Sequence, residues 1–160
     1  MTTNYSLRHS TGYNNAVKLP SRGIIIGTWN FRTLYGCGRV PELDLAPNGY
    51  RWDVIGLCET RWTNFGETTT NNGHKIMFSG DERKHQHGVR FIVRKEALES
   101  IISYSPISSR LISIRIAAKP HNLSVIQVYA PTTDYDDNEV EEFYDQLEEE
   151  IKGVAEKNTS

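Results

Sequence analysis

The chain has 160 residues, of which 38% are hydrophobic, and it contains two cysteines. This length suits one domain with its own core, and two cysteines are too few for a disulfide framework or a structural zinc site. No apolar run approaches a membrane span and the N-terminus lacks the apolar core of a signal peptide, so we expect a soluble, intracellular protein.

The net charge of -2 conceals an uneven distribution along the chain. Residues 134–160 carry 11 acidic and 2 basic side chains, which leaves 9 acidic and 16 basic side chains in residues 1–133. A basic body suits a polyanionic partner such as nucleic acid. A solvated surface explains the same charges, so the distribution alone assigns no partner.

Composition divides the chain into three parts. Residues 1–22 are polar and predict a mobile N-terminal arm. Residues 23–152 hold the apolar and β-branched runs of a single domain, and residues 153–160 form a C-terminal tail. No internal repeat is present, so we expect one globular unit rather than an array.

The first two apolar runs predict neighbouring parallel strands. The β-branched run 24–30 ends in Asn30, and the run 53–59 ends in Glu59. A parallel pair needs a crossover, and the apolar spacing in residues 40–50 predicts a helix of one or two turns there.

The remaining chain predicts short strands followed by one helix. A Thr-, Asn- and Gly-rich loop runs to Gly73. Alternating or β-branched residues then predict strands at 75–79, 89–93, 101–104, 111–117 and 123–129. An apolar stripe predicts a helix over 138–151, with Asn138 and Glu141 as its N-terminal capping pair and Gly153 just past its end. We expect all the strands to form one mixed sheet with the helix on one face.

Polar side chains follow three of the predicted strands: Asn30, Glu59 and Tyr129. Ligands collect at the carboxyl ends of strands in an open α/β sheet. A hard divalent cation prefers oxygen ligands and keeps several waters, while an amide and a phenol can bind a phosphate without adding charge. The three residues therefore suit metal-assisted phosphodiester cleavage. Taken by itself, an acidic residue such as Glu59 at a strand end is more often a helix cap or a surface charge.

Five short motifs occur along residues 24–152. They are Thr28-Trp29-Asn30, Leu57-Cys58-Glu59-Thr60-Arg61-Trp62, Ser79-Gly80 with Gly88-Val89, Ser109-Arg110-Leu111 and Val128-Tyr129-Ala130-Pro131-Thr132. In this order and spacing they resemble the endonuclease/exonuclease/phosphatase superfamily. Residues 85–89 and 106–110 are most similar to the endonuclease domain of non-LTR retrotransposons and the related craniofacial development protein 2-like proteins.

The resemblance implies a fold and a catalytic group. The fold is a four-layer α/β sandwich, of which this chain would form the N-terminal half. The activity is that of a Mg2+-dependent endonuclease that nicks DNA. Asn30 would be the active-site amide near the phosphate, Glu59 the Mg2+ ligand, and Tyr129 a contact to the scissile phosphate.

The resemblance also implies a nucleic-acid surface for DNA, with RNA as the alternative. Arg61 would grip the phosphate backbone and Arg110 would lie near the site. Trp62 suits stacking on a base, although packing on its own sheet explains a tryptophan there equally well.

The chain departs from the superfamily in its second half. The superfamily uses a later Asp-x-Asn motif on a strand and an Asp-His pair, and no Asp-His dipeptide occurs here. Asp136-Asp137-Asn138 spells Asp-x-Asn, but it follows Pro131 with no strand before it, and helix capping explains it better. We therefore expect a catalytically incomplete chain.

Other interpretations remain open at the level of sequence. The chain could be a non-catalytic remnant or a domesticated module that binds nucleic acid or protein. Among enzymes, a lipid phosphodiesterase or a deadenylase would use the same strand-end residues. His85 and His87 share one charged turn, which makes a poor metal site. Because the superfamily's second sheet lies mostly in the missing half, we also expect a large uncovered apolar face and an unstable or partner-dependent chain.

Overall fold

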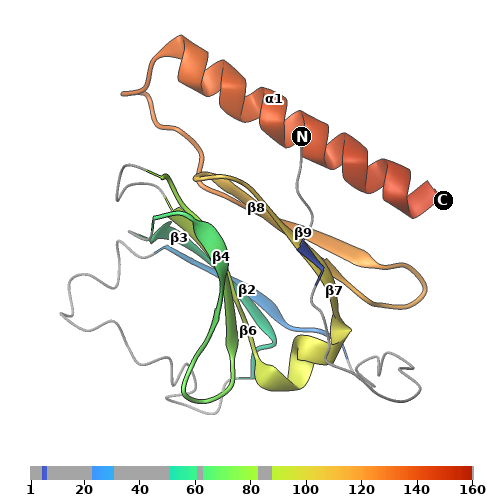
Figure 1. Cartoon of the computed structure of the whole chain (residues 1–160). Coiled ribbons are helices and arrows are strands. Elements are labelled where there is room, and N and C mark those ends of the chain that lie inside the picture. The colour runs from blue at the N-terminus through green and yellow to red at the C-terminus, as the bar shows by residue number, and fades with distance from the viewer. Residues whose placement is uncertain (1–4, 7–22, 31–50, 61–62, 83–87, 160) are drawn as a thin grey trace.

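A computed structural model gives the structure of the chain. It describes residues 5–6, 23–30, 51–60, 63–82 and 88–159, and for residues 5–6, 29–30 and 59–60 it describes the backbone alone. The described strands form two sheets with a long C-terminal helix, which is a mixed α/β architecture (Figure 1). The expectation of a single sheet was wrong.

The five-stranded sheet has the order β2-β3-β6-β5-β4. Its strands are β2 (Ile26–Asn30), β3 (Val54–Thr60), β4 (Phe65–Thr69), β5 (Lys75–Ser79) and β6 (Gly88–Val93). β2 and β3 are parallel neighbours, as predicted, and the other pairs are antiparallel. The Asp53 carboxylate fixes the start of the parallel pair, because its Oδ2 accepts a hydrogen bond from the Ile25 N–H at 2.8 Å.

The four-stranded sheet has the order β1-β7-β8-β9 and is antiparallel throughout. Its strands are β1 (Tyr5–Ser6), β7 (Ile101–Ser108), β8 (Leu111–Ile116) and β9 (Leu123–Val128). A 3-10 helix, Lys95–Ser100, connects β6 of the first sheet to β7 of the second. β1 falls in the predicted mobile arm, so two residues of that arm pair with the sheet.

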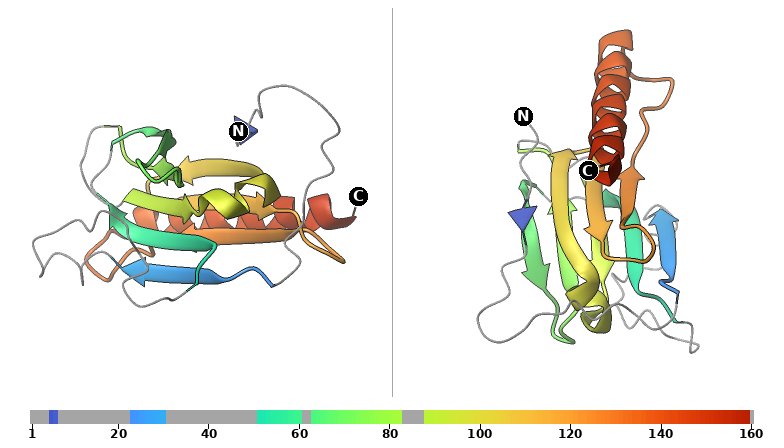
Figure 2. Two further views of the ribbon diagram at one scale, coloured as in Figure 1. Left: turned by 90° about the horizontal axis from the view of Figure 1, so that it is seen from below. Right: turned by 90° about the vertical axis from the view of Figure 1, so that its right-hand side faces the viewer.

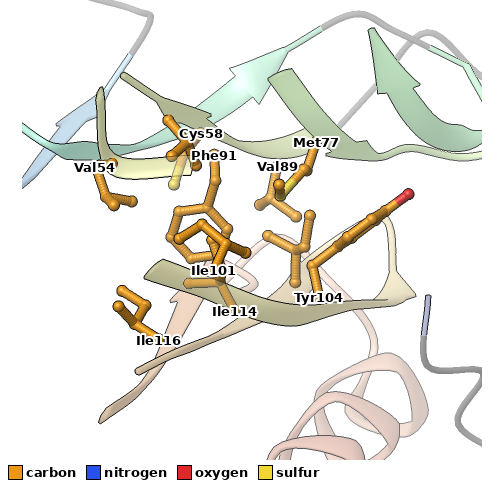
Figure 3. Packing of buried hydrophobic residues seen from close by; sticks show 12 residues of the cluster. Val54, Cys58, Met77, Val89, Phe91, Ile101, Tyr104, Ile114 and Ile116 are labelled. Atoms are coloured by element: carbon orange, nitrogen blue, oxygen red, sulfur yellow. The ribbon is translucent and has the colours of Figure 1, made fainter. Parts of the chain in front are cut away.

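The main core lies between the two sheets (Figure 3). Alternation along β6 sends Val89, Phe91 and Val93 into this interface, and all three are fully buried. From the opposite sheet, Ile112, Ile114 and Ile116 of β8 fill the same layer. The second sheet, expected to be mostly absent, therefore covers one face of the first.

The other face of the five-stranded sheet carries a smaller apolar cluster. Its buried members are Trp52, Ile55, Leu57, Ile76 and Ile92. The crossover predicted over residues 40–50 lies outside the described residues. The described part of the chain thus contains three layers, namely a helix and two sheets (Figure 2).

Helix α1 (Asp137–Thr159) lies on the outer face of the four-stranded sheet (Figures 1 and 2). Phe143 is buried at this contact, and the Ser113 hydroxyl of β8 donates a 2.6 Å hydrogen bond to Glu150 Oε1. At the far end, the Arg115 guanidinium donates to the Lys157 carbonyl oxygen and to Asn158 Oδ1. The polar face of β8 therefore holds the helix, while its apolar face fills the core.

Both predicted ends of α1 were wrong. Asp136, rather than Asn138, caps the start, because its Oδ1 accepts the N–H groups of Asn138 and Glu139 at 2.9 and 3.0 Å. The helix also continues through Gly153 to Thr159. No helix among the described residues is long and apolar enough to cross a membrane.

β4 was missed because it lies within the segment interpreted as a loop. Four of its five residues are exposed and the fifth is half-buried, so no apolar alternation marks it in the sequence. Its pairing with β5 along five residues, rather than burial, makes it a strand. A turn at residues 70–74 connects the two strands, and Gly73 has a φ of 85° in that turn, where glycine has no steric penalty.

Candidate functional site

The carboxyl ends of β2 and β3 meet at one end of the five-stranded sheet. In their parallel register Asn30 lies opposite Cys58, and Glu59 is the next residue along β3. The backbone positions of Asn30 and Glu59 are therefore adjacent, as the sequence predicted for neighbouring parallel strands. The side chains of Asn30 and Glu59 lie outside the described atoms, so their convergence on one ligand stays a prediction.

β9 of the other sheet ends at the same place. The Cys58 thiol donates a hydrogen bond to the Val128 carbonyl oxygen at 3.2 Å. Tyr129 follows Val128 directly, and its ring packs half-buried against the main core. The contact between Cys58 and Val128 thus brings Tyr129 beside the residue that precedes Glu59, although the two belong to different sheets.

Gln127 holds the two sheets together just behind this point. Its side-chain amide nitrogen donates to the Cys58 sulfur at 2.8 Å and to Thr28 Oγ1 at 3.3 Å. Only Gly56 leaves room for it, because a Cβ at that position would collide with the Gln127 amide oxygen. A glutamine at an inward position of β9, and a glycine inside the buried strand β3, were the two sequence signals of this contact.

Arg110 occupies the turn between β7 and β8 at the same end of the molecule. Its Nη1 donates to the Tyr129 carbonyl oxygen at 3.2 Å, and the Tyr129 N–H donates to the Arg110 carbonyl oxygen at 2.8 Å. The guanidinium carbon lies 5.4 Å from the centroid of the Tyr129 ring and 4.4 Å from that of the Tyr135 ring. Sequence reasoning placed Arg110 near the site but did not identify Tyr135, an aromatic residue in a polar loop.

The Ser79 hydroxyl fixes a further pair of strand ends there. It donates a 2.6 Å hydrogen bond to the Ser108 carbonyl oxygen, which connects the end of β5 to the end of β7. The Arg110 N–H in turn donates to Ser108 Oγ at 3.2 Å. Hydrogen bonds between the sheets therefore hold the turn that carries Arg110.

Several predicted residues fall outside the described part of the chain or outside the site. Arg61, Trp62, His85 and His87 all lie outside the described residues. The carboxylate of Asp136 caps α1, so the capping interpretation of the Asp-x-Asn sequence is confirmed.

Arg90 of β6 lies on the outer face of the five-stranded sheet. It is 4% exposed, and burial lowers the pKa of its guanidinium to about 10. The side chain therefore remains charged at neutral pH. Its register neighbours are Leu57 and Phe78, on the opposite side of the sheet from the main core.

A cation at these strand ends would have few protein ligands among the described residues. Among the described residues no group of three or more His, Cys, Asp or Glu side chains could hold a metal ion. Glu59, an acidic residue, and Asn30, an amide residue, hold adjacent backbone positions at the ends of β3 and β2. Mg2+ binds commonly through one or two carboxylates and keeps several waters. By chemistry, Glu59 is the residue at this point that could serve as a ligand of a hydrated Mg2+ ion.

Comparison with known proteins gave two relatives. The chain is 37% identical over 123 residues to craniofacial development protein 2 of Bos taurus and 36% identical over 123 residues to that of Tragulus javanicus. The aligned part is 77% of this chain in both cases, but only 20% and 21% of the relatives. No family model and no solved structure matches the chain. The expected resemblance to craniofacial development protein 2-like proteins is thus confirmed, and over 123 residues this protein is similar to a segment of craniofacial development protein 2 that makes up about a fifth of its length.

Proposed function

We propose that the chain is the N-terminal part of a Mg2+-dependent phosphodiesterase domain that acts on DNA, derived from a retrotransposon endonuclease and catalytically incomplete by itself. Its fold would then be half of a four-layer α/β sandwich. The observation that supports this best is the meeting of three strand ends. The register of β2 with β3 and the contact between Cys58 and Val128 bring the positions of Asn30, Glu59 and Tyr129 together.

The residues at these strand ends suit binding of a phosphodiester. A Mg2+ ion on Glu59 would supply Lewis-acid stabilisation of charge on the phosphoryl oxygens. Asn30 would hold or orient a phosphate oxygen, Tyr129 would donate a hydrogen bond, and Arg110 would supply a positive charge. Asp136, which belongs to the Asp-x-Asn sequence, caps a helix and so does not supply the general base in this proposal.

We expect the purified chain to bind DNA but to nick it weakly or not at all. Catalytic groups act as a unit, so the loss of the base and its partners lowers the rate by several orders of magnitude. Conversion of supercoiled plasmid to the nicked form, with and without Mg2+, measures the activity. Glu59→Gln is the test variant for the Mg2+ ligand. Glu67→Gln is its control, since Glu67 lies on exposed β4 in a salt bridge with Lys75.

DNA binding is measured by fluorescence anisotropy with a labelled duplex across salt concentrations. Arg110→Gln should weaken binding about tenfold and reduce the salt slope by about one, because it removes one phosphate contact. Arg94→Gln is the matched control, since Arg94 follows the opposite end of β6 and pairs with Glu96. Rapid Mg2+-dependent nicking that only Glu59→Gln abolishes would contradict the incomplete site. Absence of DNA binding would contradict the assigned substrate.

A second candidate is a non-catalytic module that binds nucleic acid. It is favoured by the absence, among the described residues, of any group of three or more His, Cys, Asp or Glu side chains that could hold a metal ion, because a lone ligand holds Mg2+ weakly. DNA binding that is independent of Mg2+ and of Glu59→Gln, with no nicking under any condition, would select this function over the first.

A further inference from the structure

Tyr135, which contacts Arg110, lies in a loop whose backbone is held by hydrogen bonds on both sides of the residue. The loop connects β9 to α1, and the Tyr135 N–H donates to the Thr132 carbonyl oxygen at 3.2 Å. The next residue, Asp136, caps α1. The cap and the turn hold the backbone on either side of Tyr135, and its ring centroid lies 4.4 Å from the guanidinium carbon of Arg110.

Arg110 retains donors for a ligand. Within the described part of the chain, its guanidinium makes one hydrogen bond, to the Tyr129 carbonyl oxygen, and forms no ion pair with a carboxylate. Three aspartates flank Tyr135 in the sequence, namely Asp134, Asp136 and Asp137. Arg110 nevertheless stacks on the tyrosine and not on a carboxylate. A guanidinium has five N–H donors, and stacking on an aromatic face leaves the edges of the plane available.

We infer that Tyr135 is a positioning residue. It holds the Arg110 guanidinium in place by stacking, while the Tyr129 carbonyl oxygen accepts a hydrogen bond from the same group. The remaining edge of the guanidinium then binds a backbone phosphate of DNA at the strand ends. This inference rests on the proposed function. A long, flexible side chain loses rotamer freedom on binding, and stacking that restricts it beforehand makes binding tighter. The aromatic face supplies this effect, so the hydroxyl of Tyr135 is not required.

The inference predicts an effect of Tyr135 that depends on Arg110. With a labelled DNA duplex at low salt, Tyr135→Leu should weaken binding about three- to tenfold, and Tyr135→Phe should bind like the wild type. In an Arg110→Gln background, Tyr135→Leu should cause no further loss, since the group that it positions is gone. Tyr144→Leu is the matched control, because Tyr144 is a 57% exposed tyrosine on α1.

Thermal unfolding of each variant separates positioning from folding. Should Tyr135→Leu fail to fold, Tyr135→Met, which keeps more of the volume without an aromatic face, takes its place with the same expected loss. Wild-type affinity in the folded variant, or an equal loss with and without Arg110, overturns the inference and leaves the proposed function intact. If the wild-type chain binds no DNA, the proposed function fails and the inference fails with it.

Discussion

Single residues determine how the two sheets meet at the candidate site. Gln127 reaches from β9 to Cys58 and Thr28 on the other sheet, and it is 8% exposed. A buried amide needs hydrogen-bond partners, and this one finds them across the sheet interface. The missing side chain of Gly56 makes the approach possible, so a glycine and a glutamine on different sheets form one packing unit.

Gly56→Ala should destabilise the protein by about 1–3 kcal/mol, because the added methyl group overpacks the buried amide. The Cβ would lie 2.7 Å from Gln127 Cδ. Gly27→Ala on the neighbouring strand is the control, since its nearest atom would be Ile55 Cγ1 at 3.9 Å, an ordinary contact. Chemical denaturation measures both. Combining Gly56→Ala with Gln127→Ala should cost less than the sum of the single changes, and strict additivity would contradict the proposed contact.

At the scale of elements, α1 continues past a glycine that, by the local sequence, should end it. Glycine just after an apolar stripe commonly ends a helix in the left-handed conformation. Gly153 instead lies within α1 and outside that conformation, and the helix continues to Thr159. The contacts of Arg115 with Lys157 and Asn158 hold the extra turns against β8.

Gly153→Ala should therefore stabilise the protein by about 0.5–1 kcal/mol, since alanine has the higher helix propensity and a Cβ at this position meets no atom within 4 Å. Ala155→Gly, at an exposed position of the same helix, should cost a similar amount. Thermal and chemical unfolding of the two variants show whether each change raises or lowers the free energy of unfolding. A loss of stability in Gly153→Ala would mean that the helix ends where the sequence first indicated.

At the scale of the whole molecule, the two sheets enclose the main core, but one side of the sandwich is open. β2 and β9 are edge strands among the described strands. Between them runs an apolar groove of about 340 Å³, lined by Ile26, Gly27, Thr28, Phe91, Val125, Ile126, Gln127 and Val128. Part of the exposed apolar surface thus lies at this edge, whereas an entire uncovered face had been expected.

The purified chain should unfold cooperatively and yet bind a hydrophobic dye at this groove. Ile26 and Val128 are each 37% exposed there, so replacing both with threonine should reduce dye fluorescence while the β-branched side chains preserve the strands. Ile102→Thr is the control, because Ile102 is 38% exposed on β7, away from the groove. Unchanged fluorescence in the double variant, or gradual unfolding without a transition, would contradict this description.

Local patterns in the sequence determined most elements and one strand pairing. The β-branched runs located β2, β3, β6, β8 and β9, and the amphipathic stripe located α1. The positions of Asn30 and Glu59 at adjacent strand ends followed from reading their runs as parallel neighbours, which the register confirms. These features were predictable because alternation and apolar runs are properties of a few consecutive residues.

Only the tertiary structure decided how the elements combine. Alternation shows that one face of a strand is apolar, but it does not show which sheet the strand joins, so two sheets were taken for one. The reach of Gln127 to Thr28 joins residues 99 positions apart, and the contact of Arg110 with Tyr135 depends on where the β9–α1 loop lies. No local pattern encodes such contacts, because packing between the sheets and the cap of α1 create the geometry that makes them favourable.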